Sequence, residues 1–463
     1  MMRWVLWVVL IFAGAVAPWF FGSWEMWWFW PFAAVLSVGI VLSGIALLLG
    51  EGTFPRGAIW ALGLCIPFCV YILFRWWLHD AVFLDAQRAV LLHVTGIGIA
   101  AVVVFLLQER QLRGVFWGLF ASLFMMSLYG IVNHLVWGSR LVLWAPRYEQ
   151  YAGRATGPYF CPDHFAGAME LFVCMGLGLV LDRGTRPWAR TLGAIAILMG
   201  AIGALMSLSR GAGMTLAVVL MLVVVFGFYQ WPKSVRLAWR AVFTFGGVLL
   251  LMGAFLVMQG YRERFVTYGG LHQVSAAQEE SVREQVVARL LRTSRGRMFT
   301  GAWFAWRTSP WLGIGPGMHR NVWPAFADSG DGDREAGIWP TLVNDTFHSY
   351  EVHSDWLELL QEHGLWGLLL FLLGVAGVVS VLLLALQREA QCWSRHELLY
   401  LMDPPQGHFM LLSGLFAIGA MGFHSLGDFN LQMPGTVWIL AVLVGLGVRS
   451  ACSGPTRGLV VED

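Results

Sequence analysis

A cluster of ionisable side chains runs from His348 to Glu358 and leads directly into a long apolar segment. Within it, His353 is followed closely by Asp355. Near neutral pH an imidazole beside carboxylates can take a proton from a hydroxyl group, for example that of a sugar. A helix beginning near Ser354 would place Asp355 in its first turn, where a carboxylate is favourable without any function, but such capping does not explain His353. The spacing matches no metal-ligand signature, so we expect no metal and no other cofactor.

Arginines with small or polar neighbours indicate a second kind of chemistry. Ser209, Arg210 and Gly211 interrupt a long apolar stretch. A guanidinium group binds phosphate oxygens through paired hydrogen bonds, and glycines allow close backbone approach, so we interpret this turn as a phosphate site. The alternative is a tight turn between two helices, which Arg210 only marks. A charge at this position is costly unless it reaches water, pairs or binds a ligand.

Three other segments carry candidate residues. Arg154 and His164 flank a Pro-Asp pair that is typical of a helix start, and the helix start explains neither of them. Arg297 precedes an aromatic segment and a Gly-Pro-Gly loop, where a plain surface arginine is the alternative. Asp428 and Asn430 follow His424 in a short polar stretch for which a turn between helices is the alternative.

Apolar segments must position these side chains. Hydrophobic residues make up 58% and charged residues 13% of the 463-residue chain, far from the roughly 25% charged residues of soluble domains. Because about 20 apolar residues cross a bilayer as a helix, we predict an all-α polytopic membrane protein with about twelve spans. The predicted spans are 4–22, 27–48, 57–78, 88–107, 113–134, 163–181, 189–208, 212–229, 238–258, 360–386, 407–425 and 433–449. The first resembles a signal peptide, but Pro18 after the apparent cleavage site favours an uncleaved helix.

The distribution of basic residues predicts the orientation. Short segments after even-numbered spans and at the termini hold 14 of the 30 basic residues, and the positive-inside rule makes them cytoplasmic. The opposite side then contains the loops 79–87, 135–162, 208–212 and 425–433 and the long insert 260–352. Within the insert we predict an amphipathic helix over 275–292 and a helix from Arg297 to Trp306. Cys161 is the lone thiol on that side, so no internal disulfide is expected.

The order of these blocks resembles the O-antigen ligase and polymerase family of bacterial membrane glycosyltransferases. The blocks that carry the resemblance are Gly157–Phe165, the Ser209–Gly211 turn, Trp311–Gly315, His353–Leu357 leading into Glu362–Gly367, and His424–Asn430. They cover about residues 150–450. Two departures concern the substrate more than the chemistry. Ser354 stands where the family often has Asn, and Cys161–Asp163 replaces a stretch that commonly contains Asn.

The resemblance implies a GT-C-like fold in four parts. These are N-terminal transmembrane helices (1–150), central transmembrane helices of the ligase-like region (151–259), a large periplasmic loop (260–352), and C-terminal transmembrane helices with a short cytoplasmic tail (353–463). It further implies transfer of a glycan from undecaprenyl diphosphate to an acceptor hydroxyl on the periplasmic face of the inner membrane. The reaction would be inverting and metal-independent, and would serve lipid A-core ligation, repeat-unit polymerisation or protein O-glycosylation.

The implied site residues fall into three groups. His353 is expected as the base or the orienting group for the acceptor hydroxyl, with Asp355 holding it, and Arg210 as the third catalytic residue. Arg154, Arg210, Arg297 and His164 are expected at the diphosphate, with Ser209 and Asp428 as further candidates. Expected partners are the lipid-linked glycan, an acceptor glycan or lipid A-core, membrane lipids and a polysaccharide chain-length regulator, but no nucleic acid. The alternative is a transporter or flippase for a lipid-linked or anionic solute. Transporters usually place polar groups near the bilayer midplane on interrupted helices, whereas here they gather at one face.

Overall fold

Helices dominate the computed structural model of the protein. It describes residues 6, 8–10, 12–78, 82–146, 148–182, 184–230, 294–326, 349–395 and 408–453. Within these ranges, eight helices are long and apolar enough to cross a membrane, and three shorter apolar helices accompany them. The prediction of an all-α polytopic membrane protein is therefore confirmed. The predicted span 238–258 and the predicted amphipathic helix 275–292 lie outside the described residues.

The longer helices are α2 (Met26–Leu48), α5 (Phe83–Leu106), α6 (Glu109–Trp137), α7 (Pro162–Leu181), α8 (Pro187–Met206), α9 (Arg210–Gln230), α12 (Ser294–Thr308), α14 (Asp355–Arg395), α16 (His408–His424) and α17 (Pro434–Cys452). The shorter ones are α3 (Arg56–Gly63), α4 (Ile66–Trp77), α13 (His319–Val322), the π-helical η1 (Phe12–Val16), and the 3₁₀ turns η2 (Ala17–Trp19), η3 (Phe21–Ser23), η4 (Glu149–Tyr151) and η6 (Trp323–Ala325). Two short strands, β1 (Leu141–Val142) and β2 (Ala145–Pro146), pair antiparallel between α6 and α7.

Three predicted spans differ from the helices observed. The described part of 4–22 is α-helical at residues 6 and 8–10, continues as π-helical and 3₁₀ turns, and is broken at Gly22, whose φ is 70°. The span 57–78 is divided into α3 and α4 because Pro67, in the first turn of α4, lacks an N–H and clashes with the preceding turn. Helix α5 begins at Phe83 rather than near residue 88. It includes Arg88, whose guanidinium donates to the Trp24 carbonyl at 2.9 Å and lies over the Trp24 ring.

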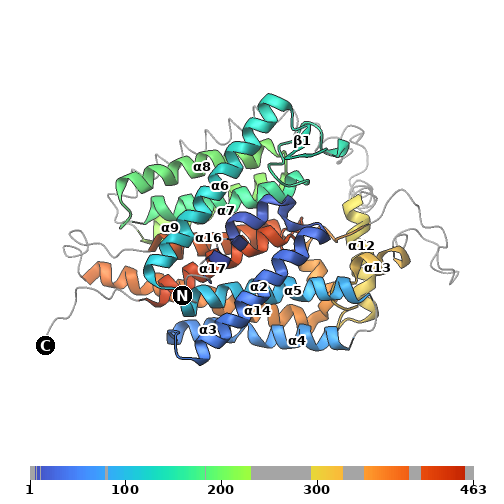
Figure 1. Ribbon diagram of the computed structural model, residues 1–463, viewed down its shortest axis with the longest axis horizontal. Coiled ribbons are helices and arrows are strands. Elements are labelled where there is room, and N and C mark those ends of the chain that lie inside the picture. Colours follow the sequence, from blue (N-terminus) through green and yellow to red (C-terminus); the bar gives the residue numbers. More distant parts are fainter. Residues whose placement is uncertain are drawn as a thin grey trace, which may run out of the picture.

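Helix α7 forms the centre of the bundle, between α8 and α16 (Figure 1). Glycines allow this close packing: a Cβ on Gly176 would lie 2.6 Å from the Gly193 carbonyl oxygen of α8. On the α16 side, a Cβ on Gly178 would lie 2.3 Å from the Phe409 carbonyl oxygen. Small residues at such contacts let helix backbones approach closely within a membrane. Side chains of α7 are therefore held rigidly within the bundle.

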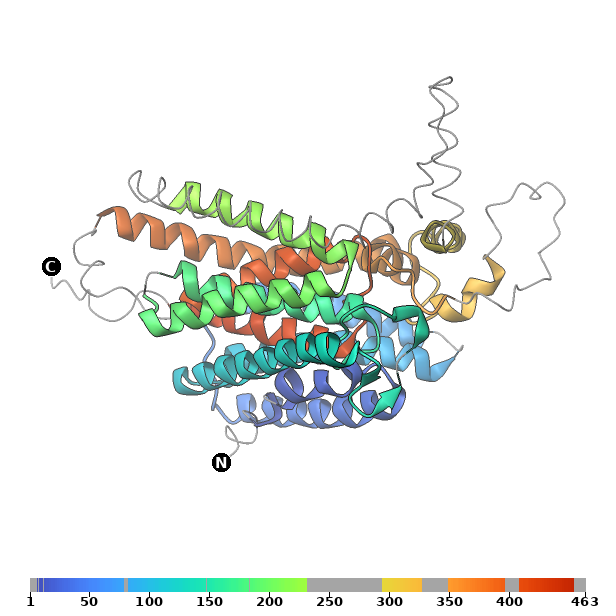
Figure 2. The same ribbon diagram turned by 90° about the horizontal axis from the view of Figure 1, so that it is seen from above.

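The connections between helices gather at two ends of the bundle. At one end lie the hairpin of β1 and β2 together with α12 and α13, as both views show (Figures 1 and 2). We call this the site end; α7, α9, α14 and α17 begin there. At the opposite end the Asp182 carboxylate accepts from the Phe409 N–H at 3.3 Å, and Arg449 donates to Thr53 at 2.7 Å. The described parts of the loops predicted to share a side thus lie at one end, while the cytoplasmic assignment of the other end stays a prediction.

Two of the sequence blocks form one structural unit at the site end. Helix α14 is broken at Gly364, which has φ 66°, and a Cβ there would lie 2.4 Å from the Trp311 backbone. The carbonyls of Gln361 and Glu362 accept from Ile314 and Gly315 at 2.9 Å each. N–H groups of the Gly-rich loop before α13 therefore hydrogen-bond to carbonyls of α14 that the break leaves without partners in the helix.

Candidate active site

His353 lies in the short segment that enters α14 and has a left-handed backbone, with φ 61°. Such a conformation is uncommon for a residue other than glycine and costs free energy unless the surroundings impose it. The imidazole is 27% exposed, stands edge-on to the Phe429 ring at 4.6 Å, and places Nδ1 3.6 Å from the Asp428 Oδ1. One face of the site end therefore presents a partly accessible imidazole backed by a carboxylate.

The Asp428 carboxylate is buried at the centre of this group. Its Oδ1 accepts from the Phe429 N–H at 2.9 Å, and its Oδ2 lies 3.7 Å from His424 Nε2 and 4.0 Å from Arg295 Nη2. Burial by itself raises the pKa of Asp428, but the imidazoles of His353 and His424, with further positive charge nearby, outweigh it. The pKa is therefore well below its ordinary value, so the carboxylate is ionised at neutral pH.

Asp355 has a different neighbourhood from the one expected. Its Oδ2 accepts from Ser425 Oγ at 2.6 Å and from the Leu431 N–H at 2.9 Å, while its own N–H donates to the Asp428 carbonyl. As the first residue of α14, it ties the start of that helix to the loop before α17. The expectation that Asp355 holds His353 is corrected: the carboxylate beside that imidazole belongs to Asp428.

Arg154 and Asp163 form a buried ion pair at 2.6 Å. The Arg154 Nε also donates to the Ser207 carbonyl at 2.7 Å, and the neighbouring Ala155 N–H donates to the Met206 carbonyl at 2.9 Å. These bonds join the segment before α7 to the turn between α8 and α9. Arg154 thus links the two blocks that the sequence singled out, and a contact with diphosphate stays a prediction.

The turn that contains Arg210 has the features of a helix start. Leu208 has φ 53°, and Ser209 Oγ accepts from the Ala212 N–H at 3.3 Å, as an N-cap does. Arg210 is the first residue of α9 and is partly exposed at the site end. Gly211 packs against the His424 ring, because a Cβ there would lie 2.8 Å from Nε2.

His164 and Arg297 of α12 complete the predicted set, and Arg295 lies on the same helix. His164 is buried at the start of α7, edge-on to Phe429 at 4.3 Å, with Nδ1 3.4 Å from the Asn430 Oδ1. On α12, Arg295 approaches Asp428, as described above; Arg297, the arginine chosen from the sequence, is partly buried two residues further along. Sequence reasoning missed Arg295.

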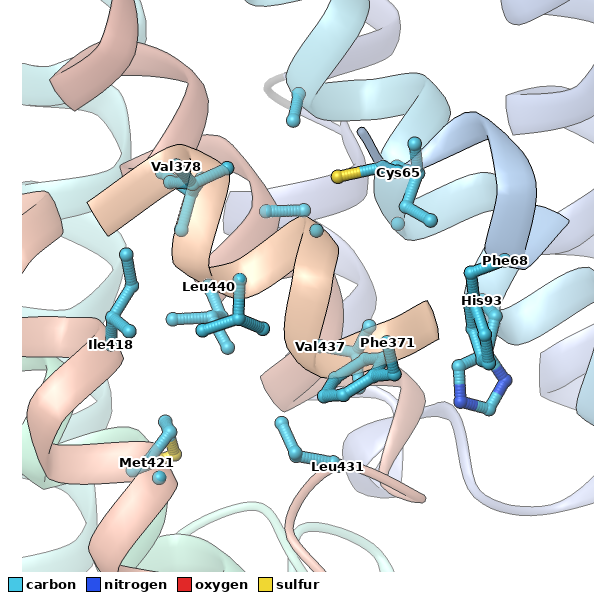
Figure 3. A pocket seen from close by; sticks show the side chains of 18 of the residues that line it. Cys65, Phe68, His93, Phe371, Val378, Ile418, Met421, Leu431, Val437 and Leu440 are labelled. Atoms are coloured by element: carbon cyan, nitrogen blue, oxygen red, sulfur yellow. The ribbon is translucent and has the colours of Figure 1, made fainter. Parts of the chain in front are cut away.

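An apolar cavity of about 250 Å³ lies beside the site. It is bounded by α3 to α5, α14, α16 and α17, and Figure 3 shows Phe371, Val378 and Leu440 among the side chains around it. Asp355 and Gln432, both from the site end, are among the few polar residues that line it. The cavity therefore joins the apolar interior of the bundle to the polar site.

A second charged cluster supports the segment that carries His353. Arg320 of α13 pairs with Glu351 at 2.5 Å and lies 3.7 Å from Asp85, while the Val352 N–H donates to Glu358 at 2.9 Å. Burial raises the pKa of Glu351, but a hydrogen bond from Glu358 and the charge of Arg320 reverse this and leave it lowered. The pKa of Arg320 is raised, because its carboxylate partners outweigh the opposing effect of burial. These contacts anchor the backbone immediately before His353.

The fold and the site together define a polytopic helical membrane protein with a polar centre at one end of its bundle. Residues 194–372 match the family of O-antigen ligases. This match includes Arg210, Arg295, Arg297, His353 and Asp355, and it confirms the resemblance seen in the sequence. It supports a membrane glycosyltransferase that uses a lipid-linked glycan and an acceptor. No curated protein matches the chain.

Proposed function

We propose that the protein transfers a glycan from undecaprenyl diphosphate to an acceptor hydroxyl on the periplasmic face of the inner membrane. The observation that carries the proposal is the meeting of the His353–Asp428 pair with Arg295 of α12, next to the start of α9 that carries Arg210, within and beside a segment that matches O-antigen ligases. The acceptor is lipid A-core in a ligation reaction or a growing glycan in a polymerisation reaction. The fold would then be of the GT-C type.

The carrier would lie across the boundary between the apolar cavity and the site. Its isoprenoid tail suits the cavity, whose lining is almost entirely hydrophobic. Its diphosphate would rest at the site end, where Arg210, Arg295 and Arg297 can offset negative charge; guanidinium groups bind phosphate oxygens bidentately. Arg154 and His164 would contribute by holding the turn and the loop around these groups.

The reaction would be a single displacement at the anomeric carbon. His353 accepts the proton of the acceptor hydroxyl, Asp428 stabilises the resulting imidazolium, and the hydroxyl oxygen attacks as the bond to the diphosphate breaks. The arginines offset the negative charge that grows on the departing diphosphate. Attack opposite to the leaving group inverts the anomeric configuration, and each step uses side chains of this chain without a metal.

The experiment compares a deletion strain of the source bacterium complemented with wild type, Arg210→Ala or His353→Ala at matched membrane levels. Loss of transfer in both variants supports the proposal. Full activity of His353→Ala, or an unchanged glycan profile in the deletion strain, contradicts it and favours transport. Single repeat units on the carrier indicate a polymerase, whereas full-length polymer on the carrier indicates a ligase.

Carrier binding separates the two roles. Loss of a general base costs a factor of about 10² to 10⁴ in rate, and loss of one charge-stabilising donor costs about 10² to 10³. Because these ranges overlap, kinetics alone does not distinguish the two roles. Purified Arg210→Ala should bind lipid-linked glycan extracted from the deletion strain more weakly than wild type does. His353→Ala should bind it normally, and equal binding by both variants would refute this division of roles.

A further inference from the structure

A buried carboxylate lies inside the central helix, behind the proposed site. Glu170 is two turns into α7, and its side chain is 1% exposed. A charge within a membrane span is costly unless it is paired or serves a function. Its partner is His424, the last residue of α16, whose Nδ1 lies 2.8 Å from Glu170 Oε1 and whose side chain has no exposed surface.

His424 has a carboxylate on each side of its ring. Opposite Glu170, its Nε2 lies 3.7 Å from the Asp428 Oδ2. A neutral imidazole donates from one nitrogen only, so a ring that faces a carboxylate at both nitrogens satisfies both only when it is doubly protonated. The backbone of α9 at Gly211 closes against this ring and limits its movement. The geometry therefore favours a fixed imidazolium between two carboxylates.

We infer that Glu170 and His424 are positioning residues for Asp428 beside His353: His424 is the cation that favours the ionised carboxylate, and Glu170 orients the His424 ring. The inference rests on the proposed function and adds to it a row of four groups, Glu170, His424, Asp428 and His353, leading from the bundle interior to the accessible imidazole. When His353 takes a proton, the ionised Asp428 stabilises the new charge. The contact with Glu170 holds the His424 imidazole in a fixed position facing this carboxylate.

Other charged groups surround the row and also influence the pKa values of its members. They are Arg295 of α12, His164 and Asp163 at the start of α7, Arg154 paired with Asp163, and Arg210 next to Gly211. None of these changes in a variant of Glu170 or His424. A shift in the pH profile of such a variant therefore reports the charge that was removed.

The two residues carry opposite charges, so their variants should shift the pH profile in opposite directions. In His424→Gln the cation next to Asp428 is lost. Asp428 and His353 are then protonated more readily, and the acid-side midpoint of activity rises. A charge within 4–6 Å typically moves a pKa by about 1 to 3 units, so we expect a rise of about one pH unit or more. In Glu170→Gln, His424 keeps Asp428 as its carboxylate partner and the midpoint falls, by less because Glu170 lies farther from Asp428.

The experiment measures transfer against pH with purified protein in lipid nanodiscs and lipid-linked glycan extracted from the deletion strain. Wild type, His353→Ala, Glu170→Gln and His424→Gln are compared, with Cys174→Ala as the matched control. Cys174 is buried one turn from Glu170 on α7, so its loss tests packing without a change of charge. We expect Cys174→Ala to keep the wild-type midpoint and all folded variants to bind donor within about twofold of wild type.

The outcomes separate the inference from the function on which it rests. Absence of transfer by wild type, or full transfer by His353→Ala, overturns the proposed function. If wild type is active and His353→Ala is not, unmoved midpoints or shifts of the same sign in both charge variants overturn the inference alone. If His424→Gln does not fold, Glu170→Gln decides: a lowered midpoint supports the inference, and an unchanged or raised one overturns it.

Discussion

A single added methyl group should disturb the site through His424. In Gly211→Ala the new Cβ would lie 2.8 Å from His424 Nε2, whereas ordinary contacts begin at 3.4 Å. The ring or the start of α9 must therefore move by about 0.6 Å, the difference between these two distances. His424 has little room, because Glu170 holds its other nitrogen at 2.8 Å. Overpacking of this kind costs typically about 1 to 3 kcal/mol.

The effect on catalysis should exceed the effect on stability. A displaced His424 or Arg210 alters the surroundings of Asp428 and the diphosphate, and a misplacement of about 1 Å can cost a factor of about 10² in rate. We therefore expect Gly211→Ala to lower the rate of single-turnover glycan transfer by about 10- to 100-fold. The protein should still melt cooperatively, with a modestly lowered melting temperature.

A matched variant controls for the exchange of glycine for alanine in a helix. Gly63, at the end of α3, has no atom within 4 Å of an added Cβ. Gly63→Ala should leave both the rate and the melting temperature at or slightly above wild type, because alanine favours helix. Wild-type transfer by Gly211→Ala, with an unchanged melting temperature, would refute the tight contact with His424.

Three further predictions follow from the contacts of the site. Because the pKa of Asp428 is lowered in the folded protein, its ionised form stabilises the fold above the unfolded pKa, and this contribution is lost as pH falls through the folded value. In Asp428→Asn the melting temperature should therefore fall less steeply as pH is lowered than it does in wild type. The rate of transfer should fall by up to about 10⁴-fold, as for other carboxylates that orient a catalytic imidazole. Asp355→Ala should lower the free energy of unfolding, measured by denaturation, by about 1 to 3 kcal/mol for each of the two buried donors that lose their acceptor. Wild-type stability of this variant would contradict the role of Asp355 in tying α14 to the loop before α17. Arg295→Ala should weaken donor binding more than Arg297→Ala, and the reverse order would return that role to Arg297.

Much of the architecture follows from local patterns. Ten of the twelve predicted spans coincide with helices or helix pairs of the structure, because apolar length alone determines where a chain can cross a bilayer. The capping position of Asp355 was likewise predictable, because α14 does begin there. Glu170 was missed although a carboxylate inside an apolar span is itself a signal, because its charge disappears in an averaged hydropathy.

From the sequence alone, one can conclude that Arg210, His353 and Asp428 emerge at the same end of the bundle, since the alternation of spans determines the end at which each loop lies. Only the tertiary structure decides which of these groups meet. Asp355 is close to His353 in the chain, but the first turn of α14 directs its carboxylate to the loop before α17, and Asp428 from that loop meets His353 instead. Side-chain direction depends on how helices and turns pack, and spacing along the chain does not encode that packing.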